Sequence, residues 1–183
     1  MRKQKHVSLS IALEEKMSIV RGFMSHHGVE ALTGLINCLN INGVVHLGQE
    51  SADTQVHQSC HINGQLKAQH VRFCCPVTIN GQATIIHSIF EQNANLSGAA
   101  TIKNSQFQTL YYRASGQSFY GTKVKELHIQ SPHTFFNKQL SVYLKEGTHI
   151  DSVIFPTDGK KGVVYVDATS SVTSITHGDR SQG

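Results

Sequence analysis

The segment from Cys60 to Leu110 contains one pattern three times: CHINGQLKAQHVRFCCP (60–76), VTINGQATIIHSIFEQN (77–93) and ANLSGAATIKNSQFQTL (94–110). The copies begin 17 residues apart, since 77 − 60 and 94 − 77 are both 17. A fixed period of this length is typical of a solenoid, in which each repeat buries its apolar face only against its neighbours. The segment therefore predicts a repeat fold.

Apolar or small residues within one repeat come in pairs that lie two positions apart. In the first copy these pairs are Cys60 with Ile62, Leu66 with Ala68, and Val71 with Phe73. A period of two is that of a strand with one buried face. The gaps between the pairs are too short for a helix but long enough for a corner. We therefore expect an all-β fold, a single-stranded β-helix with three short strands around a triangular core.

Equivalent residues of successive turns are expected to stack into inward-facing ladders. Burial of each large apolar side chain contributes roughly 1.5–3 kcal/mol, so these ladders form the predicted core. The predicted core ladder consists of Ile62, Ile79, Leu96, Phe73, Phe90 and Phe107. Gly64, Gly81 and Gly98 are predicted at corners, where glycine adopts a positive φ at little cost. Asn63, Asn80 and Ser97 precede them and are expected to bond their own backbone.

The string INGQLKAQHVRF, from Ile62 to Phe73, resembles the repeat of the bactofilins, the polymer-forming cytoskeletal proteins of bacteria. That repeat reads aliphatic-x-Gly-x-aliphatic-x-Ala-x-x-Val-x-aliphatic. The next two copies depart from it, since Ser88 and Ser105 replace the valine and Ile85 and Ile102 replace the alanine. The resemblance implies a right-handed β-helix that assembles end to end, without a nucleotide, into a cytoplasmic scaffold.

The register extends beyond the three clear copies. Leu39 aligns with Cys60 at an interval of 21, because the segment 48–53 adds four residues at one corner. Residues 132–144 are expected to hold a further coil, and 163–175 the last one. The predicted β-helix domain is 35–176, with six to seven turns, followed by a disordered polar tail at 177–183.

The N-terminal segment 1–34 lacks the repeat and is expected to be an accessory to the coil. Leu13, Met17 and Val20 have helical spacing, which predicts a helix. Two interpretations stay open: a cap over the first coil, or a peripheral membrane anchor that uses its basic residues.

Composition narrows the class of protein. The 183 residues carry a net charge of +4 and no basic patch interleaved with aromatic residues, so nucleic acid is not an expected partner. Four cysteines, two of them adjacent, do not form a disulfide framework, which favours the reducing cytoplasm. No apolar run is long enough to cross a bilayer. No cofactor-binding motif is present, and none is expected.

Enzymatic and metal chemistry are considered and not favoured. A carbohydrate-active β-helix enzyme or a polysaccharide-binding module is the alternative function, and the enzyme would need paired carboxylates. Glu91 is the only acid between Asp53 and Glu126, so the regular coils lack such a pair and no enzyme is expected. His57, Cys74 and Glu91 recur at 17-residue intervals as a line, whereas zinc requires tetrahedral ligands.

Self-association through the coil ends is the expected function. A terminal coil has unpaired backbone groups around an exposed apolar core, and such an edge pairs readily with another chain. The C-terminal coil contains only Asp167 as a charge between 163 and 175. Its inward residues Val164, Val166 and Val172 are the candidate assembly surface. The expected partner is therefore a second copy of this chain.

Overall fold

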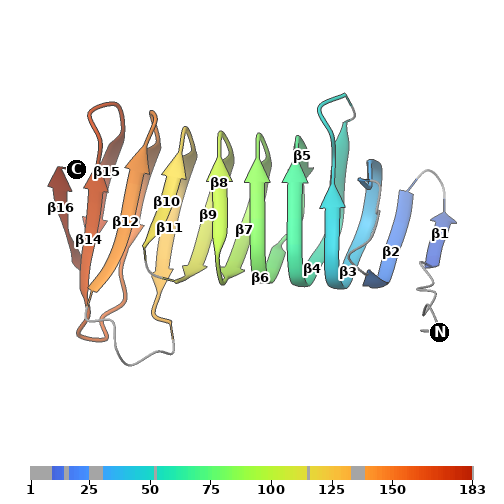
Figure 1. The fold of residues 1–183 in the computed structure, drawn as a ribbon, viewed down its shortest axis with the longest axis horizontal. Helices are drawn as coiled ribbons and strands as arrows, with labels where there is room; N and C mark the ends of the chain where they lie inside the picture. Colours follow the sequence, from blue (N-terminus) through green and yellow to red (C-terminus); the bar gives the residue numbers. More distant parts are fainter. Residues whose placement is uncertain are drawn as a thin grey trace, which may run out of the picture.

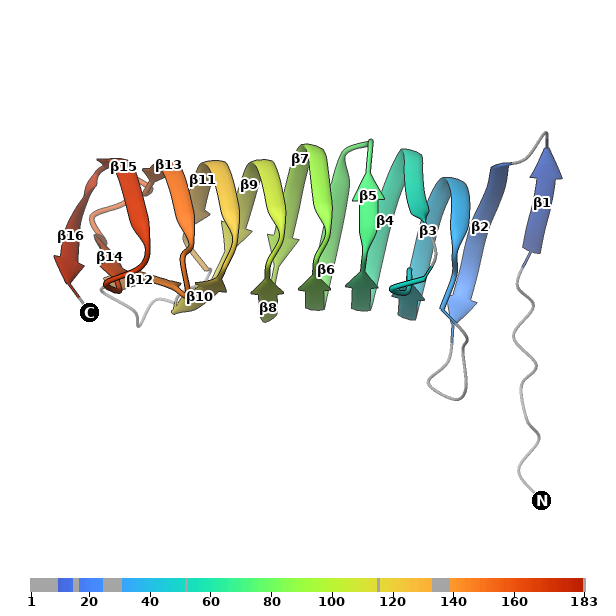
Figure 2. The ribbon, with the colours of Figure 1, turned by 90° about the horizontal axis from the view of Figure 1, so that it is seen from above.

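The computed structural model describes residues 10–14, 17–24, 31–51, 53–114, 116–132 and 139–182, and these residues form a β-solenoid without a helix. Figure 1 shows its coils stacked in one row, and Figure 2 shows β1 and β16 at opposite ends of that row. In chain order the strands are β1 (Ser10–Glu14), β2 (Met17–Met24), β3 (Gly34–Leu47), β4 (Thr54–Gln69), β5 (Val71–Phe73), β6 (Val77–Ile86), β7 (Ile89–Ser97), β8 (Ala100–Lys103), β9 (Gln106–Arg113), β10 (Gln117–Tyr120), β11 (Lys123–Gln130), β12 (Gln139–Lys145), β13 (His149–Ile154), β14 (Lys161–Val166), β15 (Ser171–Thr176) and β16 (Gly178–Gln182).

Each coil has three sides, which we name after the third coil of the solenoid. In this coil, 77–93, the first side is at 77–79, the second at 83–85 and the third at 88–90. Parallel pairing along the third side joins one residue from each of about eight coils. This column consists of Ile36, Val56, Phe73, Phe90, Phe107, Val124, Ile150 and Val172. The predicted fold class is thus confirmed.

The core is one continuous column of apolar side chains along the solenoid. Phe73, Phe90 and Phe107 stack with ring centroids 4.5 and 4.4 Å apart, and each is at most 4% exposed. Ile62, Ile79 and Leu96 are in register and equally buried. The predicted core ladder is therefore confirmed. The register of the first coil is also confirmed, because Leu39 pairs with Cys60 across the insertion.

The corner glycines are required by close approach between coils. Gly81 has φ of 138°, and a Cβ there would lie 2.0 Å from the carbonyl oxygen of Gly64. Gly64 and Gly98 have the same relation to the glycine of the preceding coil, with φ of 138° and 120°. The asparagines before them differ from the prediction, because their amides bond each other between coils. Asn80 donates to Asn63 at 3.0 Å, and Asn63 donates to Asn42 at 2.9 Å.

A second corner carries a buried ladder of hydroxyl groups. Its members are Ser88, Ser105, Thr122, Thr148 and Ser170, all buried. Each hydroxyl accepts a backbone N–H from the coil before it, as Ser105 does from Ser88 at 3.2 Å. Several also donate to a carbonyl of their own coil, as Ser105 does to Lys103 at 2.7 Å. These bonds explain why serine replaces the valine of the bactofilin-like repeat in these copies.

The ends of the chain differ from the sequence-based expectation. The predicted N-terminal helix is wrong: β2 lies parallel to β3, with Val20 opposite Leu39, and β1 pairs antiparallel with β2. The open edge of β3 offers the segment backbone partners, and this tertiary pairing outweighs a helical spacing. The rest of 1–34, apart from residues 31–34, lies outside the described residues. The prediction of a disordered tail at 177–183 is also wrong, because residues 178–182 form β16, which pairs with β14.

Two further corrections concern the coil count. The solenoid has about eight coils, more than the six to seven predicted, and the eight stacked residues of the third side all lie between Ile36 and Val172. Residues 139–144 do not form a separate coil. They belong to β12, which pairs with β10 and β14 and is the second side of the coil whose first side lies in β11 (Figure 1). Residues 133–138, between these two strands, lie outside the described residues.

Candidate functional site

The predicted assembly surface is only partly at the end of the solenoid. Val164 lies opposite Arg180 and Val166 opposite Gln182, so β16 covers both valines. They are buried, and the prediction that they form the end surface is wrong. Val172 does lie on a terminal strand, β15, and is 9% exposed. The end surface is thus built from β15 and β16.

This terminal coil has open strand edges. In the described part of the chain, β15 pairs only with β13, and β16 pairs only with β14. The inward-facing residues of β15 are Val172 and the half-buried Ile175, which packs against the core. Charged residues occur on β16, where Asp179 forms an exposed ion pair of 3.4 Å with Lys161. The end therefore combines unpaired backbone groups with a small apolar area.

The line of His57, Cys74 and Glu91 does not form a metal site among the described residues. These residues contain no group of three or more His, Cys, Asp or Glu side chains that could hold a metal ion. Partial burial and the nearby Glu91 carboxylate raise the pKa of Cys74, which keeps its thiol protonated. A protonated thiol is a poor metal ligand. Burial likewise raises the pKa of Cys75 to about 11.

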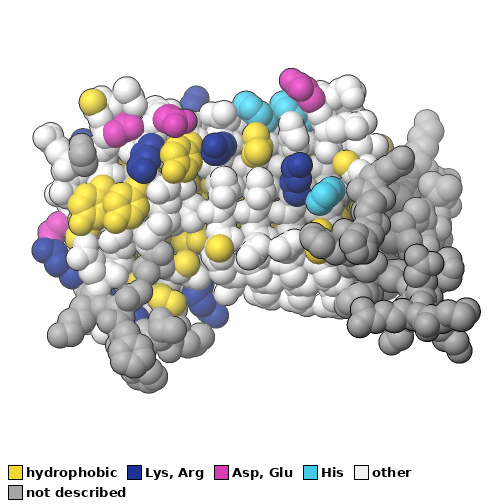
Figure 3. Space-filling model, in the orientation of Figure 1, with side chains coloured by type: hydrophobic (Ala, Val, Ile, Leu, Met, Phe, Trp, Pro, Cys, Tyr) yellow, Lys and Arg dark blue, Asp and Glu magenta, His cyan; other side chains and the backbone are white. Residues whose placement is uncertain are grey.

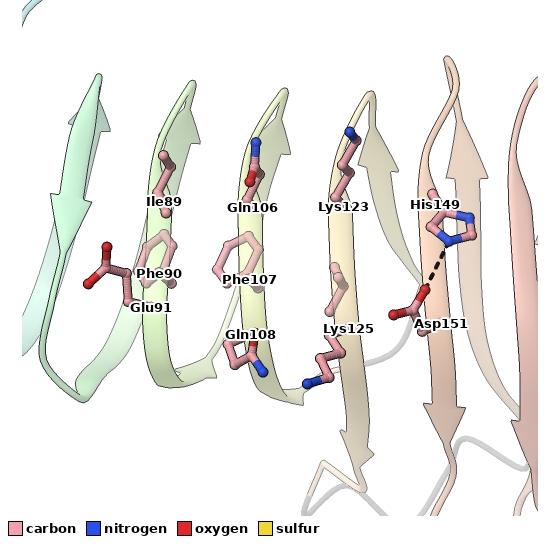
Figure 4. A pocket seen from close by; sticks show the side chains of 11 residues that line it. Ile89, Phe90, Glu91, Gln106, Phe107, Gln108, Lys123, Lys125, His149 and Asp151 are labelled. Atoms are coloured by element: carbon pink, nitrogen blue, oxygen red, sulfur yellow. Dashed lines mark hydrogen bonds and ion pairs between the residues drawn. The ribbon is translucent and has the colours of Figure 1, made fainter.

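A shallow groove of about 400 Å³ runs across β7, β9, β11 and β13 on the third side. Outward-facing residues border it in two rows, one on each side of the buried column (Figure 4). One row consists of Ile89, Gln106, Lys123 and His149, and the other of Glu91, Gln108, Lys125 and Asp151. Strand alternation creates the rows, since the residues before and after each inward-facing residue point outward.

Charge is unevenly distributed along this groove. Lys123 and Lys125 are exposed at its middle, and neither forms an ion pair with a described residue. At one end, Glu91 is bound by Arg72 at 2.6 Å. At the other end, Asp151 contacts the His149 ring at 2.9 Å. The acids thus have partners, and the two lysine ammonium groups remain available to an anion.

The His149 ring also contacts a hydroxyl group. Its Nδ1 lies 2.7 Å from the Ser171 Oγ, and its Nε2 lies 2.9 Å from the Asp151 carboxylate. The three residue types match a hydrolase triad. However, the His149 and Asp151 side chains are 47% and 54% exposed, so water solvates both. Catalytic triads work in sites that exclude water, and this row is therefore a solvated polar ladder.

The carboxylates of the groove are too far apart for glycoside hydrolysis. Glu91 and Asp151 follow the stacked residues Phe90 and Ile150, which are separated by three strand spacings. At roughly 4.8 Å per spacing this is about 14 Å. Paired glycosidase carboxylates lie roughly 5–9.5 Å apart. The groove can therefore bind through its charges, but its acids do not form a catalytic pair.

The remaining acids considered from the sequence have structural partners. A side-chain hydrogen bond from Ser170 lowers the pKa of Asp167. The N–H groups of Glu146 and Thr169, which donate to this carboxylate at 2.8 and 2.9 Å, lower it further. A hydrogen bond from Ser131 lowers the pKa of Asp158. Both acids therefore stabilise corners.

A row of lysines and tyrosines lies on the second side, over β8 to β14, where Figure 3 shows dark-blue side chains between yellow ones. The Lys103 and Lys145 ammonium groups lie 5.4 and 5.6 Å from the Tyr120 ring centroid. Tyr143 and Tyr165 stack at 4.9 Å. The sequence shows no basic patch interleaved with aromatic residues, because these residues are 17 to 25 positions apart, at the intervals 103–120 and 120–145. Only the coil brings them together.

Comparison of the chain with models of known protein families, with curated proteins and with solved structures yields no match. The class of molecule is therefore set by the structure alone: a β-solenoid with an open C-terminal coil and a lysine-bearing groove on one side. Nothing in the described part of the chain is a helix that could cross a membrane.

Proposed function

We propose that this chain is a structural protein of the bactofilin type, which self-associates through its coil ends without a nucleotide. The observation that carries the proposal is the open C-terminal coil, where β15 and β16 each have one paired edge in the described part of the chain. Pairing these edges with another molecule adds strand hydrogen bonds and removes apolar surface from water at the same time.

The repeat supports a mechanical role. Its sides are closed by pairing between coils, so association is directed to the ends. Two C-terminal ends that meet form a closed, two-fold dimer, whereas a C-terminal end that meets an N-terminal end forms an open filament. Both assemblies require the end surface around Val172 and β16.

The test is light scattering and negative-stain microscopy of the full chain and two variants. Val172→Lys places an ammonium group on the inward, apolar side of β15 and should abolish assembly. Thr173→Lys adds the same charge at an exposed position of the same strand and should assemble like the parent. A parent chain that stays monomeric at high concentration contradicts the proposal. So does a Val172→Lys variant that assembles as the parent does.

We further propose that the chain is not an enzyme, which is supported by the solvated His149 row and the separated carboxylates. Saturable activity on a panel of acidic polysaccharides that Asp151→Asn abolishes would contradict this.

The four cysteines are free, which supports a place in the reducing cytoplasm. Membrane contact through the first residues stays part of the proposal. The absence of a nucleic-acid partner stays a prediction, since the second side does bring Lys103, Lys145 and Tyr120 together.

A further inference from the structure

The groove on the third side carries charge for which the described residues supply no partner. Lys123 and Lys125 lie on one strand and point outward on either side of the buried Val124. Their backbone positions are two residues apart, roughly 6.6 Å. An anionic group in the groove between them is therefore attracted by two ammonium groups at once.

We propose that this groove binds an extended acidic peptide segment of a partner protein, with an aspartate or glutamate side chain between Lys123 and Lys125. Binding here goes beyond self-assembly, because the groove lies on the side of the solenoid and not at its ends. Variants of the groove should therefore leave assembly unchanged.

The surroundings of the two lysines fit a peptide. Gln106 and Gln108 border the groove one coil before the lysines, and their amides can bond the N–H and C=O groups of a peptide backbone. On the other side, the Asp151 carboxylate is hydrogen-bonded to the His149 ring at 2.9 Å, so this acid already has a partner within its own row. The middle of the groove thus offers cations and amides together.

An aliphatic residue at one end defines the spacing of the ligand. Ile89 is half-buried in the row that otherwise contains Gln106, Lys123 and His149. It is two strand spacings from Lys123, roughly 10 Å. A peptide in the polyproline II conformation advances about 3.1 Å per residue and presents every third side chain on the same face, so this distance corresponds to three residues. The groove therefore fits a peptide in which an apolar residue and an acidic residue lie three positions apart.

The same features favour a peptide over other polyanions. A polyuronate carries carboxylates but no aliphatic side chain to contact Ile89. Single-stranded nucleic acid binds through base stacking on aromatic rings. The phenylalanine rings of the groove, Phe90 and Phe107, are only 2% and 4% exposed, and the one histidine ring that lines it, His149, is bonded to Ser171 and Asp151. An acidic peptide with an apolar residue uses both the lysine pair and Ile89.

The test measures fluorescence anisotropy of a labelled peptide with a Leu-Ser-Ser-Asp core, added to the full chain at low salt. Lys123→Gln with Lys125→Gln should weaken binding roughly tenfold, as expected for two exposed ion pairs. Ile89→Ser should weaken it about fivefold through lost apolar contact. Lys67→Gln with Lys103→Gln removes equal charge from the second side and should leave binding unchanged. Higher salt should weaken binding to the parent.

Three results would overturn the inference. The first is equal loss of affinity in both lysine double variants, which would indicate attraction to net charge alone. The second is a peptide affinity that is insensitive to Ile89→Ser and to the exchange of the peptide leucine for serine. The third is tighter binding of polygalacturonate or oligothymidylate than of the peptide. Circular dichroism of each variant checks that the surface substitutions leave the fold intact.

Discussion

Ser105 completes a backbone hydrogen bond of the coil before its own: its hydroxyl accepts the N–H of Ser88 at 3.2 Å and donates to the Lys103 carbonyl at 2.7 Å. Ser105 is 1% exposed, so no water replaces it easily. Ser105→Ala should lower the free energy of unfolding by about 1–3 kcal/mol, because a buried N–H loses its acceptor. Urea denaturation of this variant and of Thr101→Ala, an exposed position, measures the difference. Equal stability of both variants would refute the role of the ladder.

The phenylalanine stack is expected to be the least tolerant part of the core. Phe90 lies between Phe73 and Phe107, with centroids 4.5 and 4.4 Å away. Phe90→Ala should cost about 3–5 kcal/mol, and Phe90→Asp should prevent folding because it buries an unpaired charge. Gln108→Asp, an exposed acid near the same column, should melt like the parent. If Phe90→Asp also melts like the parent, the column is incorrectly assigned.

Gly81 is expected to be required for two reasons: its positive φ, and the lack of space for a Cβ beside the preceding coil. Gly81→Ala would place a Cβ 2.0 Å from the Gly64 carbonyl oxygen, so the coils must separate. Gly116 has φ of 78°, and a Cβ there would meet nothing within 4 Å, so Gly116→Ala adds backbone strain alone, about 1–2 kcal/mol. Thermal denaturation should show a clearly larger loss for Gly81→Ala. Equal losses would mean that only φ matters.

Alkaline pH is expected to destabilise the fold through Tyr112. Burial raises the pKa of Tyr112 to about 12, against about 10 in an unfolded chain. The folded state therefore holds this proton more tightly, and its contribution to stability is fully present below pH 10 and lost as the pH rises through about 12. Tyr112→Phe also loses the 2.8 Å bond to the Gly98 carbonyl, so it should be less stable at pH 7. Denaturation between pH 9 and 12 should show a shallower decline for this variant, and an unchanged slope would contradict the assignment.

Removal of the last strand is expected to expose the core. β16 covers Val164 and Val166, and Gly178 lies so close to Phe155 that a Cβ there would be 2.5 Å from its ring. A chain that ends at residue 176 should bind more hydrophobic dye and associate less specifically than the full chain. The control is a full chain with Asp179→Asn, which keeps the strand. Unchanged dye binding after truncation would show that β16 does not protect the end.

The regular coils could be predicted from sequence because each residue there faces its equivalent 17 positions away. The corner between β11 and β12 could not, because the extra residues break this period. β16 could not be predicted either, since its sequence, GDRSQ, has no apolar alternation and is in the sheet only through backbone pairing. The groove is hidden in the sequence for a related reason: Gln106, Lys123 and His149 become neighbours only when the register across that irregular corner is known.

The strict nearest-neighbour stacking of the coils has a kinetic consequence. Every coil contacts only the coils before and after it. When one more coil folds onto a coil that is already formed, the chain therefore closes a loop of about one coil's length, and this length is similar at every step. Folding should therefore begin in the regular coils around Phe90 and spread outward like a zipper. Unzipping should start at the two ends, so that amide hydrogens in β15 and β16 exchange with solvent long before those of β7.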